Sequence, residues 1–214
     1  MDKLQFLWSF HKAILLCVPP LLYFVGGIGG QLVSKTKLTV STAWGLARAA
    51  STAVLFFSLA CCCYALWEGP SLAGKPHIAS TFSVGAGHIS FRFDLVESLM
   101  LLLVTFLGWV IVSYSQAYMA GDPKEPSYIS HLMLTLAAVT LLVVTNSIVV
   151  FVIAWILTGL ALHGLLTLYP TRQAAVIAAH KKFLASRLGD ITLLCGVLIL
   201  GTQAGSFELD RIAD

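Results

Sequence analysis

The chain alternates long apolar runs with short polar segments. An apolar helix needs roughly 20 residues to cross a bilayer core about 30 Å thick. Six runs meet or approach that length, and they cover about residues 13–30, 43–67, 95–118, 130–146, 147–169 and 184–203. This pattern predicts an all-α integral membrane protein with about six transmembrane helices.

One segment between the second and third runs follows a different period. In TFSVGAGHISFRF, residues 81–93, apolar and polar side chains alternate on both sides of a glycine-rich turn. This pattern predicts a short outside β-hairpin over residues 79–94. Asp94 followed by Glu97 fits the start of a helix, where both acids would cap the backbone, with a proton-carrying role for Glu97 as the alternative.

The hairpin divides the chain into two expected parts. Residues 1–92 would hold two N-terminal transmembrane helices and the outside hairpin. Residues 93–214 would form the first part of a helix bundle.

Composition agrees with a membrane protein, because 58% of the residues are hydrophobic and only 11% are charged. If the six spans alternate in direction, one side carries eight lysines and arginines and the other side five. The positive-inside rule places the richer side in the cytoplasm, so both termini are expected outside. The net charge of +3 reflects this topology, and no basic patch with aromatic platforms predicts nucleic-acid binding.

The five cysteines, Cys17, Cys61–Cys63 and Cys195, all fall inside the predicted spans. Consecutive helical residues point in different directions, so Cys61–Cys63 cannot converge on one metal ion. We expect packing roles for them, and no disulfide, metal or other cofactor bound by this chain. Because no GxSxG, P-loop or HExxH pattern is present either, the chain is expected to be a transport or coupling subunit rather than an enzyme.

Polar residues inside the apolar runs are the remaining functional signal. A charge near the bilayer centre costs about 3 kcal/mol or more on insertion scales, so it persists mainly when it is paired or faces a wet interior. Arg187 and Asp190 are three residues apart and share one helix face, where each partly neutralises the other. Two interpretations stay open: a structural ion pair that locks the sixth helix to its neighbours, or part of an ion path.

His163 interrupts the otherwise apolar fifth run. Counted from Tyr169 and Leu184, His163 and Asp190 each lie six residues, about 9 Å, into their helices, so we expect them at one level of the membrane. Because histidine changes charge near neutral pH, His163 is a candidate for an ion path. A hydrogen bond from His163 to a carbonyl of a neighbouring helix is the alternative.

The segment from about Phe93 to Ile212 resembles the start of the proton-conducting membrane subunits shared by respiratory complex I, in its antiporter-like subunit 5, and the Mrp cation antiporters. The similar stretches are FDLVESLMLLLVTFLGWVIVSYSQAYM, the VVTNSIVVFVIAW junction and AAHKKFLASRLGD. The last has the spacing K-x-F-x-x-x-R-x-x-D in Lys181, Phe183, Arg187 and Asp190. The resemblance implies that Arg187 and Asp190 reach a polar axis through the membrane, with Lys181 on the same ion path.

One position differs from the complex I pattern and distinguishes between subfamilies. Where complex I subunits have a glutamate directly after the tryptophan of helix five, this sequence has Trp155-Ile156, and isoleucine cannot carry a proton. The stretch WILTGLALHGLLTLYPTRQAAVIAAHKKFLASRLGD is more similar to DabB subunits, the membrane partners of DabA in energy-coupled inorganic-carbon accumulation. His163 follows Ile156 by seven residues, on nearly the same helix face, and is the candidate to replace the lost carboxylate.

The resemblance implies a multi-pass subunit of the bacterial inner membrane that couples a cation gradient to uptake of inorganic carbon. The proton is the first candidate for that cation. Its DabA-like partner would hold zinc in a site similar to a β-carbonic anhydrase and convert carbon dioxide to bicarbonate. Members of the family continue into a broken seventh helix and a second repeat, so we expect either that this sequence is a fragment or that another chain completes the fold. A divergent complex I or Mrp-type proton-translocating subunit and a non-conducting membrane assembly scaffold stay open as alternatives.

Overall fold

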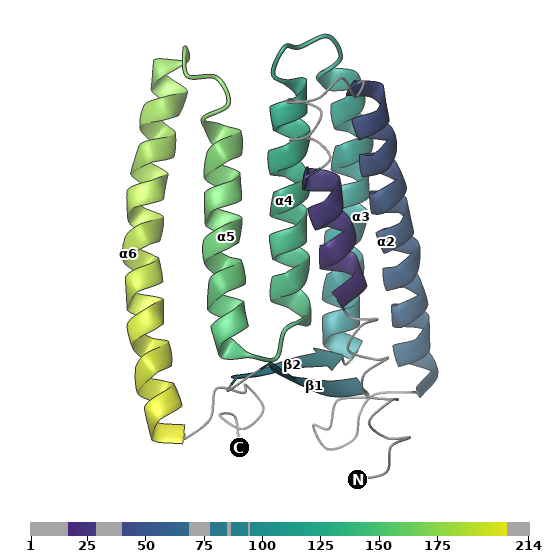
Figure 1. Cartoon of the computed structure of the whole chain (residues 1–214), viewed down its shortest axis with the longest axis vertical. Helices are drawn as coiled ribbons and strands as arrows, with labels where there is room; N and C mark the ends of the chain where they lie inside the picture. Colours follow the sequence, from purple (N-terminus) through teal and green to yellow (C-terminus); the bar gives the residue numbers. More distant parts are fainter. Residues whose placement is uncertain (1–16, 29–39, 69–77, 85–86, 94, 205–214) are drawn as a thin grey trace.

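The computed structural model describes residues 17–28, 40–68, 78–84, 87–93 and 95–204. Long helices dominate this part of the chain and lie side by side, with α6 at one edge of the array (Figure 1). The helices are α2 (Val40–Glu68), α3 (Leu95–Tyr118), α4 (Glu125–Val144), α5 (Ile148–Leu166) and α6 (Gln173–Ala204). A shorter helix, Cys17–Ile28, precedes them.

Five of these helices are long and apolar enough to cross a membrane. The prediction of a multi-pass helical membrane protein is therefore confirmed, but the first of the six expected spans is a shorter apolar helix within the described residues. The ends of that predicted span, 13–16 and 29–30, lie outside the part that the structure describes.

Two helices begin earlier than the apolar runs predicted. The fourth begins at Glu125 instead of residue 130, and the sixth begins at Gln173 instead of residue 184. With 32 residues, α6 is about 48 Å long, well beyond the 30 Å of a hydrocarbon core. An apolar run marks only the part of a helix that the bilayer must bury, and good helix formers such as Ala174 continue the helix outside it.

Two strands pair antiparallel between α2 and α3. They are β1 (Ile78–Val84) and β2 (Gly87–Phe93), with Ile78 opposite Phe93 and Val84 opposite Gly87. They occupy the segment where the alternating pattern predicted a hairpin, and they lie across one end of the helices (Figure 1). Asp94 lies outside the described residues, and Glu97 is in the first turn of α3, so the capping role remains a prediction.

The α3–α4 and α5–α6 turns lie together at the end of the array opposite the hairpin (Figure 1). The helices from α2 to α6 thus alternate in direction, as the orientation argument assumed. The assignment of the hairpin to the outside and of the two turns to the cytoplasm remains a prediction.

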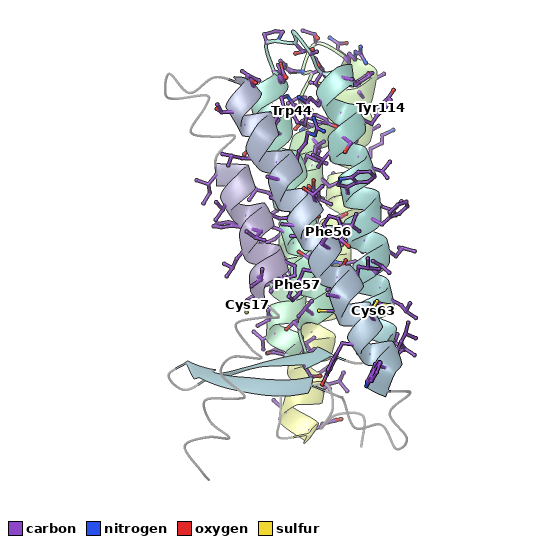
Figure 2. The ribbon with its side chains drawn as sticks, turned by 90° about the vertical axis from the view of Figure 1, so that its right-hand side faces the viewer. Cys17, Trp44, Phe56, Phe57, Cys63 and Tyr114 are labelled. Carbon is purple, nitrogen blue, oxygen red and sulfur yellow. The ribbon has the colours of Figure 1, made fainter. Side chains whose placement is uncertain are left out.

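Small and polar side chains join the first helices, as is usual inside a membrane, where apolar side chains have no preference for each other over lipid. Ser58 on α2 and Thr105 on α3 share a buried hydrogen bond of 2.7 Å. Ser130 on α4 donates to the carbonyl of Gly27 at 2.9 Å. The indole of Trp44, near the end with the turns (Figure 2), donates to the buried carboxylate of Glu125. These bonds hold α2, α3 and the helix Cys17–Ile28 around α4.

The cysteines within this array are free thiols. Cys62 is buried, and Cys17 and Cys61 pack against a small core that includes Leu101 of α3. Cys63 and Cys195 are exposed on their helices. These positions agree with packing roles for Cys17, Cys61 and Cys62.

Side chains from the two turns form a clamp at the end opposite the hairpin. Tyr169 donates a hydrogen bond of 2.5 Å to Asp122, and Lys124 donates to the carbonyl of Leu168. The cations of Lys124 and Arg172 lie 5.0 and 5.4 Å from the centre of the Tyr169 ring. The hydrogen bond from Tyr169 lowers the pKa of Asp122 and raises the pKa of Tyr169 itself.

This clamp predicts a pH-dependent effect of Tyr169→Phe. A carboxyl with a lowered pKa stabilises the fold above its ordinary pKa of about 4, and this contribution is lost as pH falls through the lowered pKa. We therefore expect Tyr169→Phe to lower the melting temperature of the purified protein at pH 7, and the difference to shrink below about pH 4. Tyr114→Phe, on the exposed face of α3, is the matched control. Equal melting curves at both pH values would contradict the clamp.

Candidate ion-path site

Arg187 and Asp190 form the ion pair that their spacing predicted. Nη2 of Arg187 lies 2.7 Å from Oδ2 of Asp190. The Asp190 side chain is 6% exposed and that of Arg187 is 28% exposed, so the carboxylate is the buried partner. The pair lies near the middle of α6 and not at its mouth, because the helix begins at Gln173. A charge pair is therefore placed deep in a membrane-length helix, where it is costly and usually functional.

The second partner of Asp190 comes from α5. The indole Nε1 of Trp155 donates to Oδ1 of Asp190 at 3.1 Å, so the two carboxylate oxygens have different partners. Sequence reasoning named Trp155 only as the neighbour of Ile156 and missed this contact. The signal was present in the pattern, because an indole N–H inside an apolar helix needs an acceptor.

Arg187 fits closely against its surroundings. Its guanidinium lies 5.0 Å from the centre of the Phe183 ring, one turn earlier on α6. A Cβ atom on Gly159 would lie 3.3 Å from Nη2, so the absence of a side chain lets α5 approach the guanidinium. Nε of Arg187 is buried without a hydrogen-bond partner among the residues that the structure describes. Such an atom is a place for a water molecule or for a group from outside this part of the chain.

His163 lies elsewhere than expected. Its ring centre is 4.7 Å from that of Phe183 and 5.6 Å from that of His180, whereas Asp190 faces Trp155. Trp155 and His163 are eight residues apart, which is about 12 Å along α5. The prediction that His163 and Asp190 share one level is therefore wrong. The cause is the early start of α6, which shifts its pairing with α5 by about two turns.

The surroundings of His163 test the alternative in which it bonds to a carbonyl of a neighbouring helix. Its Nδ1 is buried and has no hydrogen-bond partner within the described ranges. That nitrogen is therefore not bonded to a carbonyl of a neighbouring helix within them. Ile156, the position without the expected glutamate, packs with Phe151 and Leu193 against a small apolar core between α5 and α6.

A groove of about 800 Å³ runs between α5 and α6 beside the ion pair. Trp155 and Gly189 line it, and so do the polar side chains of Lys182, Ser186 and Thr192. Lys181 is exposed on α6 and does not line this groove. Of the two neighbouring lysines, Lys182 is the one that lines the groove.

Two further histidines near His163 were missed by sequence reasoning. His180 lies beside it on α6, and His131 of α4 packs against Gly164, the residue that follows it. A Cβ atom on Gly164 would lie 2.1 Å from Cδ2 of His131, which measures how closely α4 and α5 approach there. In the described residues, no three His, Cys, Asp or Glu side chains gather in a way that could hold a metal ion.

Two family models match the chain. Residues 82–129 match "NADH-Ubiquinone oxidoreductase (complex I), chain 5 N-terminus", and residues 145–214 match "NADH:quinone oxidoreductase/Mrp antiporter, TM". The second match contains α5, α6 and the ion pair on α6.

Among curated proteins, a probable inorganic carbon transporter subunit DabB from Hydrogenovibrio crunogenus is 35% identical over 94% of this chain. The chloroplastic NAD(P)H-quinone oxidoreductase subunit 5 of Chlorokybus atmophyticus is 30% identical over 91% of the chain. The chain spans 35% and 30% of the length of these two relatives.

The fold also resembles that of a chain in an archaeal respiratory membrane complex, the membrane-bound sulfane sulfur reductase. The TM-score is 0.74 at 16% identity, with 94% of this chain and 39% of the other covered. The family matches, the relatives and the shared fold agree with the resemblance read from KKFLASRLGD. The chain belongs to the superfamily of membrane subunits that includes subunit 5 of complex I and the Mrp antiporters.

Proposed function

We propose that this chain is the cation-conducting membrane subunit of a complex that takes up inorganic carbon. A cation gradient, with H⁺ as the first candidate, would drive the uptake across a bacterial inner membrane. The reaction itself would take place on a partner resembling DabA, which would hold zinc and convert carbon dioxide to bicarbonate. This chain would then couple ion flow to that reaction without catalysing it.

The observation that carries the proposal is the buried Asp190 between Arg187 and Trp155, at mid-height of α6. A carboxylate there can take up and release a cation, because Arg187 balances its charge when no cation is bound. The groove beside it is mostly apolar and carries the polar side chains of Lys182, Ser186 and Thr192. Ile156 in place of a glutamate argues against the pumping site of complex I subunits and supports the DabB-type assignment.

The test is to purify the chain under mild detergent from the cells that produce it, together with its native partners. We expect a large zinc-containing soluble protein to be recovered in constant ratio with the chain. Zinc is measured by elemental analysis, and an unrelated tagged multi-pass protein from the same membranes is the control. Recovery of flavin or iron–sulfur subunits would contradict the proposal and support the complex I alternative, which the relatives at 30% identity favour.

A further inference from the structure

Three histidines come from three adjacent helices near the end of the array that carries the two turns (Figure 1). His131 is in the second turn of α4, His163 is in the last turn of α5, and His180 is in the second turn of α6. The rings of His163 and His180 meet edge to face with their centres 5.6 Å apart. The ring of His131 packs against Gly164. We call these three residues the histidine layer.

Local hydrogen bonds decide which nitrogen of the two outer rings is available. Nδ1 of His131 lies 2.7 Å from the carbonyl oxygen of Ser127, and Nδ1 of His180 lies 2.7 Å from that of Val176. A carbonyl oxygen only accepts, so we assign the hydrogen of each neutral ring to Nδ1. Both rings therefore present Nε2 with a free lone pair, ready to accept a proton.

The ring of His163, in the middle of the layer, differs from the two outer rings at Nδ1. Nδ1 of His163 is buried and has no hydrogen-bond partner in the described part of the chain. A buried polar atom without a partner costs about 1–3 kcal/mol, so packing alone does not account for a histidine at this position. Exposure also changes across the layer, because His180 is exposed whereas His163 and His131 are partly buried. His180 and His163 thus connect the surface of α6 to a partly buried ring.

We propose that the histidine layer is the proton entrance of the ion path, an inference that rests on the proposed function. His180 takes a proton from water on Nε2 and becomes positively charged. It then gives this proton to the unprotonated nitrogen of His163 and returns to its neutral form. His131, whose ring packs against Gly164 beside His163, is the next acceptor on its own Nε2 in this proposal. Only N–H bonds form and break, and one proton moves from water to the interior.

The charged groups that lie near the layer in the sequence are mostly cations. The same stretch of α6 carries Lys181, Lys182 and Arg187, and the adjoining turns carry Asp122, Lys124 and Arg172. Most of these groups are cations, and they repel a second positive charge in the layer. From the layer, α6 continues past Lys181 and Lys182 to Arg187 and Asp190 near its middle, which form the ion pair.

The test uses the assembled native complex in vesicles, with proton entry followed by an internal pH-sensitive dye under an imposed gradient. We expect His180→Gln to slow proton entry about tenfold to a hundredfold, the usual range for losing a positioned proton-transfer group. Because His180 is exposed, this variant leaves the fold intact. His88→Gln in β2, at the hairpin end, is the matched control and keeps the full rate. His131→Gln should also slow proton entry.

A second variant separates proton transfer from packing. With His180→Gly, added imidazole should restore proton entry, since the free base can enter the space left by the ring and carry the proton. A slow His180→Gly that imidazole does not restore would overturn the proton entrance. The proton entrance would also be overturned if the His180 and His131 variants conducted protons as fast as His88→Gln while Asp190→Asn was inactive. That result would leave the proposed function standing. A wild-type complex that conducts no protons would overturn both proposals.

Discussion

Replacing Arg187 by methionine and Asp190 by leucine together is expected to abolish cation-driven uptake of inorganic carbon, with membrane insertion and partner binding preserved. The double change removes both charges at once, so the cost of placing each charge in the membrane disappears together with their attraction. Buried ion pairs are often replaced by apolar residues of similar size without loss of stability. An ion path, in contrast, needs the charges themselves.

The measurement is uptake of labelled inorganic carbon by cells that express the whole complex, with the amount of assembled complex determined in the same membranes. Asp190→Asn should be nearly as damaging, because an amide keeps the hydrogen bond from Trp155 but cannot exchange a proton. Because the leucine leaves the indole without its acceptor, a second version of the double variant also carries Trp155→Phe.

The matched control removes a polar pair far from α6. Arg48 donates to Gln116 at 3.1 Å between α2 and α3, and Arg48→Met with Gln116→Leu makes a similar chemical change there. This control should keep its uptake. Full uptake by the assembled Arg187→Met, Asp190→Leu variant would refute the ion path and leave the pair with a structural role, as in the scaffold alternative.

Replacing Gly164 by leucine is expected to destabilise the contact between α4 and α5. A Cβ atom at this position would lie 2.1 and 2.4 Å from Cδ2 and Nε2 of His131, so the ring or the helix must move. Overpacking of this kind costs about 1–3 kcal/mol, and more where the backbone shifts. We expect a clear fall in the melting temperature of the purified protein in detergent.

Two further variants show whether the close approach is the cause. Gly45→Leu on α2 is the matched control, because nothing lies within 4 Å of the added Cβ atom. Combining Gly164→Leu with His131→Ala removes the ring that the new side chain meets, and it should restore part of the lost stability. If Gly164→Leu melts like Gly45→Leu, the packing of His131 on Gly164 is not as the structure has it.

The sequence predicted several elements well because their signals are local. Hydrophobicity over about 20 residues is a property of each helix alone, so the spans α2, α3 and α5 follow closely from their apolar runs. Alternation on both sides of the glycine-rich segment at residues 85–87 depends only on neighbouring residues, and the strands β1 and β2 lie there. The shared face of Arg187 and Asp190 also needs no more than the helical period.

The pairing between α5 and α6 could not be obtained in this way. It depends on where α6 begins, and the polar cluster His180-Lys181-Lys182 separates that start from the long apolar run at 184–203. The resulting shift of about two turns separated His163 from Asp190 and placed Trp155 there.

The sequence by itself determined the membrane class, most of the spans, the superfamily motif and the ion pair, because each depends on residues close together along the chain. The tertiary structure decided which side chains from other helices contact the ion pair and His163. Trp155 reaches Asp190, and His131 and His180 gather around His163, only because α4, α5 and α6 pack in one particular register. Close contacts at Gly159 and Gly164 accompany that register. Contacts between residues far apart in the sequence cannot be predicted from the hydrophobic period of any single helix.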